Sequence, residues 1–304
     1  MSLNSKTGLY HENASTSIKW IDRDNDYSID DECPVLTRDG NVYVLSPCEK
    51  SEVITGWSLL EMSQVTNDYV VIVDNICGEI SFKPIMDFYN DDSIIISSVY
   101  IGDYNTVLES LLCWRIYFKT GRWEKFERSV PDKLFDNDYD YGIIISNNKL
   151  WFYGVDYYEP KQGNNCLYSC DLLGLDEDWA TSSPMPVDLR KYESIDCCSF
   201  GTKIVIIGFV SDNHNKDNEL FVYDSETNIW DPYISKLPVR TLMPGNLRVI
   251  IYKNCGVFIS YKSSYDNSDR YKYDCFLYNM KNHYWRKVEI DVPDGMKGSI
   301  LAIV

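Results

Sequence analysis

Histidines are the first residues to consider for chemistry, because this chain of 304 residues holds only three of them. His11, His214 and His283 fall in different parts of the sequence pattern, whereas a copper or iron site needs several histidines that converge. The sequence also lacks a Gly-x-Ser-x-Gly motif, a phosphate-binding loop and a His-Glu-x-x-His motif. We therefore identify no catalytic residue and expect no such metal centre.

The cysteines are the second candidate for chemistry, and their placement predicts buried thiols. The ten cysteines are scattered and form no Cys-x-x-Cys pair. Cys166 and Cys170 lie in a predicted strand that would separate them by roughly 13 Å, which is too far to bind one metal. Several others lie inside apolar strands, where Cys behaves as a small hydrophobic residue.

One acidic segment has almost the spacing of a calcium loop. Asp22-Arg-Asp-Asn-Asp-Tyr-Ser-Ile-Asp30 places oxygen ligands at alternate positions. Such a loop also needs Gly at its sixth position and Glu at its twelfth, where this chain has Tyr27 and Cys33. We predict a solvated hairpin turn there, and we predict no metal or other cofactor.

Charge and hydropathy exclude two classes of partner. Asp and Glu number 46 against 29 Lys and Arg, so the formal charge is −17 and the chain repels nucleic-acid phosphates. The first ten residues hold no apolar stretch, and runs such as Ile204–Val210 are too short to span a membrane. We expect a cytoplasmic monomer that binds neither nucleic acid nor membrane, or a secreted protein if a leader has been removed.

The strands and turns predicted from the sequence follow a pattern that recurs about every fifty residues. In the clearest copy, Leu220 to Pro238, a strand leads into the turn Asp224-Ser-Glu-Thr-Asn228, and Trp230 begins a second strand. Each copy closes on a proline, and these are Pro34, Pro84, Pro131, Pro184, Pro238 and Pro293. A period of this length in a strand-rich chain indicates a repeat architecture.

Each copy has the strand content of a propeller blade. Before Leu220 the sequence predicts a hairpin around Gly201, so the unit holds four antiparallel strands; Asn147-Asn148 supplies the corresponding hairpin turn in the preceding unit. We predict an all-β, six-bladed propeller formed as a single domain from residues 1–304. The expected blades are 1–34 plus 299–304, 35–84, 85–131, 132–184, 185–238 and 239–293. The C-terminal strand 299–304 would join the N-terminal strands and close the ring.

The sequence Tyr223-Asp-Ser-Glu-Thr-Asn-Ile-Trp230, followed by Leu237-Pro238 and preceded by a hairpin strand ending in Gly208, resembles the kelch repeat. The resemblance implies a propeller whose units often carry a basic residue just after the closing proline, near the mouth of the central channel. Arg190 and Arg240 match that place. In kelch-like sugar epimerases, arginines and a Glu line such a mouth. Here they would either form salt bridges that line the channel or contact a ligand.

The irregular loops between the second and third strands of each unit are the predicted binding face. Rigid scaffolds present function on loops, and Tyr and Arg dominate binding hot spots. The loop residues concerned are Tyr157, Tyr158, His214, Tyr265 and Arg270. We predict a scaffold module that binds a protein or peptide, with a basic partner steered by the acidic surface. The alternative is a carbohydrate-active propeller, either a lectin or a sugar isomerase or hydrolase. Its central-channel pocket would hold Arg190 or Arg240 with at least two carboxylates and stacked aromatics.

Overall fold

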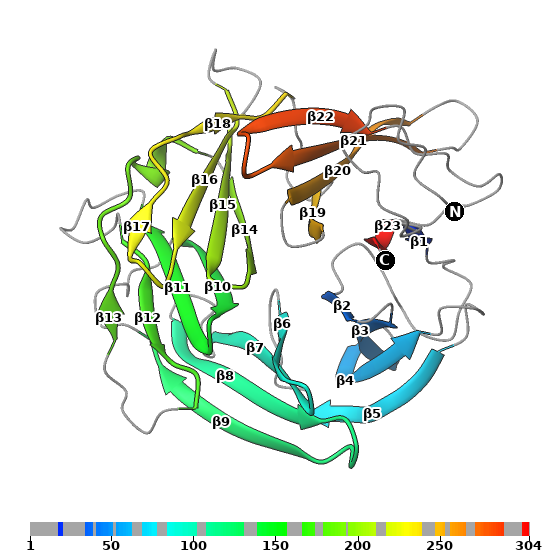
Figure 1. The fold of residues 1–304 in the computed structure, drawn as a ribbon. Coiled ribbons are helices and arrows are strands. Elements are labelled where there is room, and N and C mark those ends of the chain that lie inside the picture. Colours follow the sequence, from blue (N-terminus) through cyan, green and yellow to red (C-terminus); the bar gives the residue numbers. More distant parts are fainter. Residues whose placement is uncertain are drawn as a thin grey trace. The chain divides into compact units, whose positions relative to one another are not determined.

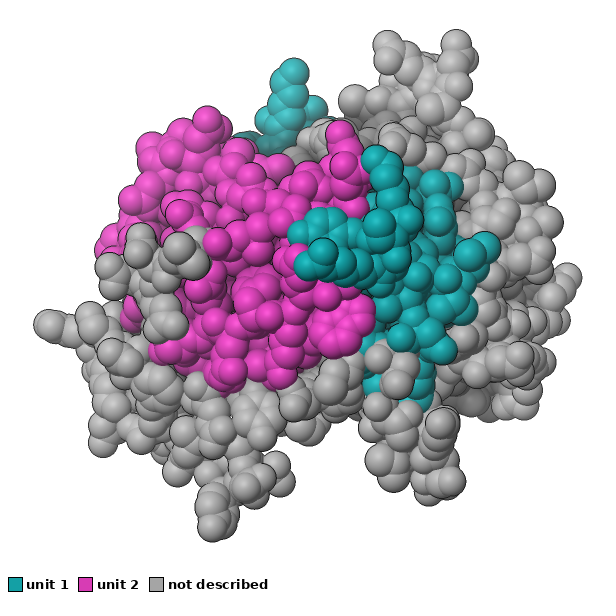
Figure 2. Space-filling view, turned by 90° about the horizontal axis from the view of Figure 1, so that it is seen from below, with its two compact units in different colours: residues 1–80, 116–122, 246–304 teal, residues 81–115, 123–245 magenta. Residues whose placement is uncertain are grey.

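Antiparallel strands make up most of the described chain. The structure is a computed structural model that describes residues 18–20, 34–38, 41–50, 53–62, 69–77, 84–101, 108–130, 139–156, 166–173, 179–192, 194–210, 217–238, 247–252, 256–265, 271–288 and 300–303. The chain divides into two compact units (Figure 2). Unit 1 comprises Met1–Ile80, Ile116–Arg122 and Asn246–Val304, and unit 2 comprises Ser81–Arg115 and Trp123–Gly245.

Unit 2 contains three antiparallel sheets, drawn from cyan to yellow in Figure 1. Their strand orders are β6-β7-β8-β9, β10-β11-β12-β13 and β14-β15-β16-β17, and a further strand, β18, also pairs with β16. The strands are β6 (Ile85–Asn90), β7 (Ser93–Ile101), β8 (Leu108–Tyr117, whose last two residues are assigned to unit 1), β9 (Trp123–Ser129), β10 (Tyr139–Ser146), β11 (Lys149–Asp156), β12 (Tyr168–Asp171), β13 (Ala180–Thr181), β14 (Ser194–Phe200), β15 (Lys203–Phe209), β16 (Glu219–Asp224), β17 (Ile229–Trp230) and β18 (Ser235–Lys236). A short 3-10 helix, η1 (Leu189–Lys191), precedes β14.

Unit 1 contains two further four-stranded antiparallel sheets and one pair of strands. The sheets have the orders β2-β3-β4-β5 and β19-β20-β21-β22. The strands are β1 (Ile18–Trp20), β2 (Val35–Arg38), β3 (Asn41–Lys50), β4 (Val53–Met62), β5 (Tyr69–Cys77), β19 (Leu247–Tyr252), β20 (Gly256–Tyr265), β21 (Tyr271–Asn279), β22 (Tyr284–Val288) and β23 (Ile300–Ile303). β1 pairs antiparallel with β23, with Ile18 opposite Ile303, so the predicted pairing between the two chain ends is present.

The hairpin turns lie where the sequence places them, because they hold residues that tolerate positive φ. Asn147 and Asn148, with φ of 52° and 57°, join β10 to β11 in a two-residue turn. Positive φ at both central residues gives the twist that a tight hairpin needs, and Asn adopts it at low cost. Gly201, with φ of 52°, begins the turn from β14 to β15.

A second turn recurs with constant spacing and explains the conspicuous tryptophans. In three copies one residue adopts a positive φ of 53° to 61°, and its N–H donates to the carbonyl four residues earlier at 2.8 to 2.9 Å. These residues are Gly121, Asn228 and His283. A tryptophan follows two residues later in each copy, as Trp123, Trp230 and Trp285. What recurs is thus a backbone conformation: a turn residue with positive φ sets the direction of the strand that follows it.

In unit 2 two tryptophans, Trp230 of the turn just described and Trp179, donate hydrogen bonds to the neighbouring repeat. The Trp230 indole N–H donates to the carbonyl of Ser183 at 3.0 Å, and the Trp179 indole N–H donates to the carbonyl of Ser129 at 3.0 Å. Each acceptor lies within two residues of a closing proline, so tryptophan and proline segments mark the contact between consecutive repeats.

The core of unit 2 lies between adjacent sheets. One buried cluster joins β10, β11 and Leu167 of the second sheet's repeat to the third sheet, and a second cluster joins β7 and β8 to the second sheet. Cys113 and Cys170 are free thiols buried in the second cluster. Burial raises the pKa of Cys113 to about 12, because desolvation disfavours the thiolate. The prediction of buried thiols therefore holds for some cysteines of the described residues. Four others are only partly buried, and they are Cys48, Cys166, Cys197 and Cys198.

Replacing the outer tryptophan of the third sheet should destabilise the protein. Trp230→Phe removes the bond to Ser183 from a side chain that is 9% exposed, and we expect a loss of about 1 to 3 kcal/mol in the free energy of unfolding. Trp123→Phe is the matched control, since Trp123 is 37% exposed at the same place in its turn. Urea denaturation checks this, and equal losses in the two variants would contradict the role assigned to the indole bond.

Candidate functional site

A cluster of charged residues lies at one end of the third sheet of unit 2, where η1 leads into β14. Asp188 caps η1, and its carboxylate accepts hydrogen bonds from both the backbone N–H and the guanidinium of Arg190. The Arg190 Nη2 to Asp188 Oδ2 distance is 2.5 Å. These hydrogen bonds hold the pKa of the Asp188 carboxyl below its usual value, because they favour the charged form. The pair is local, since the residues are two apart in sequence.

The position of Tyr192 depends on a glycine in the next strand. A Cβ atom at Gly208 would lie 2.4 Å from the Tyr192 ring, so any side chain there would force the ring to move. Gly208 in β15 is paired with Glu219, the first residue of β16. The ring therefore lies flat against the sheet, with 1% of the residue exposed, and its hydroxyl reaches Glu219.

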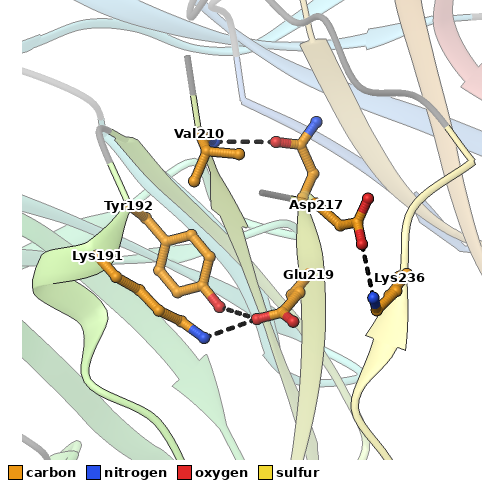
Figure 3. A network of polar contacts seen from close by, with 7 residues as sticks. Lys191, Tyr192, Val210, Asp217, Glu219 and Lys236 are labelled. Atoms are coloured by element: carbon orange, nitrogen blue, oxygen red, sulfur yellow. Dashed lines mark hydrogen bonds and ion pairs between the residues drawn. The ribbon is translucent and has the colours of Figure 1, made fainter. Parts of the chain in front are cut away.

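The Glu219 carboxylate receives two donors on one oxygen. The Tyr192 hydroxyl and the Lys191 ammonium both donate to Oε2, the ammonium at 2.8 Å (Figure 3). Burial, and then Glu219 itself, raises the pKa of the Tyr192 hydroxyl, which stays protonated and keeps donating. Within the described part of the chain, Oε1 receives no hydrogen bond, and the Glu219 side chain is 18% exposed. Glu219 is therefore a carboxylate with one oxygen fixed by two donors.

A buried amide fixes the backbone on which Glu219 stands. The side-chain oxygen of Asn218, a fully buried residue, accepts a hydrogen bond from the N–H of Val210 at 2.9 Å, and its backbone carbonyl accepts one from the N–H of Leu237 at 2.9 Å. Asn218 thereby joins the end of β15 to the segment that follows β18. The preceding residue, Asp217, forms an ion pair with Lys236, with 2.6 Å between the ammonium nitrogen and Oδ2.

The far end of the same strand carries a comparable ion pair outside the cluster. Asp224, the last residue of β16, pairs with Lys203 at 2.6 Å. The two carboxylates at the ends of β16 are therefore both paired with lysine, and they differ in that Glu219 also accepts from a buried tyrosine. Asp224 provides an internal comparison for any experiment on Glu219.

Of the residues predicted for the site, the structure places Arg190 in this cluster, with its guanidinium bound to Asp188. Tyr265 is the last residue of β20, and the structure does not describe its side chain. The others lie outside the described residues, and they are Tyr157, Tyr158, His214, Arg240 and Arg270. The acidic segment Asp22–Asp30 also lies outside them. These assignments stay predictions.

Sequence reasoning missed Glu219, Lys191 and Tyr192. The available signal was the combination of a tyrosine shortly after a closing proline with a glycine ending the hairpin strand. No group of three or more His, Cys, Asp or Glu side chains suited to a metal occurs in the described ranges. Among the same residues no helix is long and apolar enough to cross a membrane.

Comparison with known proteins gives fold matches alone. No protein-family model and no curated protein sequence matches the chain. An exo-β-1,3-galactanase from Clostridium thermocellum is 9% identical with a TM-score of 0.53, and the match covers 92% of this chain and 69% of that one. An exo-β-1,3-galactanase from Phanerochaete chrysosporium, solved with β-1,3-galactotriose, is 9% identical with a TM-score of 0.52, covering 88% and 65%. The fold is accordingly all-β and propeller-like, built of four-stranded antiparallel sheets.

These matches correct the main functional prediction. The prediction of a kelch scaffold that binds a protein or peptide is wrong, because the two matched structures are named as exo-β-1,3-galactanases. The physical reason lies in the residues that suggested kelch. Tyr223, Asn228 and Trp230 form the left-handed turn and the inter-sheet contact, so they report how a sheet is built and carry no information about its ligand.

Substituting the glycine beneath Tyr192 should disturb the cluster. Gly208→Ala places a methyl group inside the ring's van der Waals radius, and we expect about 1 to 3 kcal/mol of destabilisation together with a changed near-ultraviolet circular dichroism spectrum. Gly201→Asn is the control, because nothing lies within 4 Å of a Cβ there and Asn tolerates positive φ. The free energy of unfolding of Gly201→Asn should fall by less than about 1 kcal/mol. A Gly208→Ala variant as stable as the wild type would contradict the close packing of the Tyr192 ring on Gly208.

The Asp188–Arg190 pair should contribute to stability in a pH-dependent way. A carboxyl whose pKa is lowered on folding stabilises the fold above its unfolded pKa, and this contribution disappears as pH falls through the folded pKa. Asp188→Asn should therefore cost a few tenths of a kcal/mol at about pH 7, with a smaller difference from the wild type at about pH 3. Chemical denaturation at both pH values checks this. If the wild type's advantage in unfolding free energy over Asp188→Asn were larger at about pH 3 than at about pH 7, the lowered pKa of Asp188 would be contradicted.

Proposed function

We propose that this chain is a carbohydrate-active protein that binds a saccharide at Glu219. The observation that carries the proposal is the unequal use of the two carboxylate oxygens. Oε2 is held by Tyr192 and Lys191, and Oε1 accepts no hydrogen bond from the described residues. A carboxylate fixed in this way presents one strong acceptor in a defined direction.

Sugar hydroxyls suit such a site because each one both donates and accepts hydrogen bonds. Glu219 supplies the acceptor. Lys191 and Arg190, which neighbour it in η1, supply donors from side chains that are 35% and 32% exposed. Since the carboxylate is ordered before any ligand arrives, little conformational entropy is lost on binding. The cluster contains an arginine with two carboxylates, which is one of the features that the carbohydrate alternative requires, beside a central-channel pocket and stacked aromatics.

The matched structures suggest the first ligands to test. Both are named as exo-β-1,3-galactanases, and one was solved with β-1,3-galactotriose. A β-1,3-linked galactan is therefore a reasonable starting substrate for this chain. Hydrolysis would need a second carboxylate about 5 to 10 Å from the first, on the other side of the scissile bond.

The proposal includes a finer architecture. Residues 1–304 would form one propeller of six blades, with the β1–β23 pair as part of the sixth. The saccharide would then enter a central-channel pocket with Arg190 and Arg240 near its mouth. Arg240, which follows Pro238, would be the equivalent of Arg190 in the next repeat.

Removing the charge of Glu219 should weaken saccharide binding. Glu219→Gln keeps the shape of the side chain and loses the charge-assisted hydrogen bonds, so we expect at least about tenfold lower affinity for β-1,3-galactotriose or whichever neutral glycan of a panel binds best. Isothermal titration calorimetry measures this. Asp224→Asn is the matched control, because it alters an ion-paired carboxylate at the opposite end of β16 and should leave the affinity unchanged.

The outcomes separate the forms of the proposal. Binding accompanied by release of reducing sugar, lost in Glu219→Gln, indicates a hydrolase, whereas binding without turnover indicates a lectin. If the wild type binds no saccharide of the panel, or if Glu219→Gln binds as well as the wild type, the proposed function is wrong.

A further inference from the structure

We infer that Asp188 is a specificity-determining residue, which occupies the guanidinium of Arg190 and makes the site select uncharged saccharides over anionic ones. The inference rests on the proposed function and deepens it, because it names the class of sugar that the Glu219 site accepts. It concerns a different residue from the one that tests the proposed function itself.

Arg190 would otherwise be the natural partner of an anionic sugar. A planar guanidinium binds a carboxylate through two parallel hydrogen bonds, which is the arrangement a uronic acid or a sialic acid would use. In this structure the Asp188 carboxylate takes that arrangement instead. Arg190 Nε lies 2.8 Å from Oδ1 and 3.0 Å from Oδ2, and Nη2 lies 2.5 Å from Oδ2.

The Asp188–Arg190 pair is local and partly exposed, so a ligand can reach it, and replacing Asp188 should cost little stability. The backbone N–H of Arg190 also donates to Asp188 Oδ1 at 3.1 Å, which holds the carboxylate in place within a single turn. The two side chains remain 32% and 43% exposed. A ligand that reaches Lys191 therefore approaches an arginine whose charge is already balanced.

The two lysines of the cluster are also each paired with a carboxylate. Lys191 pairs with Glu219 at 2.8 Å and Lys236 pairs with Asp217 at 2.6 Å. Together with Asp188 and Arg190, these ion pairs match three cations with three carboxylates. An anionic sugar would have to displace one of these carboxylates, and the formal charge of −17 would also repel it. A neutral sugar meets neither obstacle.

The test compares two probes that differ at one position. Methyl β-galactoside and methyl β-galacturonide share their ring hydroxyls, and C6 carries a hydroxymethyl group in the first and a carboxylate in the second. NMR titration of the full chain should give a lower dissociation constant for the galactoside. Asp188→Asn should raise the affinity for the galacturonide relative to the galactoside by about fivefold, and added salt should reduce this gain.

Two further variants identify the group responsible. Asp188→Asn combined with Arg190→Gln should lose the gained preference, since the released guanidinium is then absent. Asp224→Asn releases Lys203 at the other end of β16 and should leave the ratio of affinities as in the wild type. Thermal unfolding of each variant confirms that it is folded.

The inference is overturned if the wild type binds the galacturonide as tightly as the galactoside, or if folded Asp188→Asn leaves the ratio unchanged. Either result leaves the proposed function standing, since saccharide binding that depends on Glu219 would remain. Binding of neither probe to the wild type overturns the inference, whereas the proposed function falls only if no saccharide of the wider panel binds.

Discussion

The close approach of the Tyr192 ring to Gly208 is the constraint on which the site depends. Because a Cβ atom would lie 2.4 Å from the ring, the glycine lets an aromatic side chain lie directly on the sheet beside Glu219. Burial then keeps the tyrosine hydroxyl protonated as a donor, and the donor fixes one oxygen of the carboxylate. A single missing side chain in β15 thus determines which way Glu219 presents its other oxygen.

The surrounding repeat makes this constraint possible. The left-handed turn at Asn228 sets the direction of the strand that follows, and the Trp230 indole bonds it to the preceding sheet. Asn218 closes the opposite end by joining the end of β15 to the segment after β18. Neighbouring sheets share buried apolar side chains along this length. The charged cluster therefore stands on strands that are held at both ends, as a preorganised binding site requires.

Sequence alone could predict the features that depend on local conformation. The turn at Asn147-Asn148, the turn at Gly201 and the pairing of β1 with β23 follow from positive-φ preferences and from the strand count of each repeat. The function could not be predicted in this way, because the residues that form the turns are required by the sheet whatever it binds. Glu219 escaped notice for a similar reason: a glutamate at the start of a strand is typical of a solvent-exposed position, and only packing with Tyr192 makes it a fixed acceptor.

A crystal structure of the protein with a bound oligosaccharide, beginning with β-1,3-galactotriose, tests the central claim most directly. The account predicts a sugar hydroxyl within about 2.5 to 3.0 Å of Glu219 Oε1, with the Tyr192 hydroxyl still bound to Oε2. A saccharide bound elsewhere on the molecule, with Glu219 making no contact to it, would contradict the assignment of this carboxylate as the centre of the site.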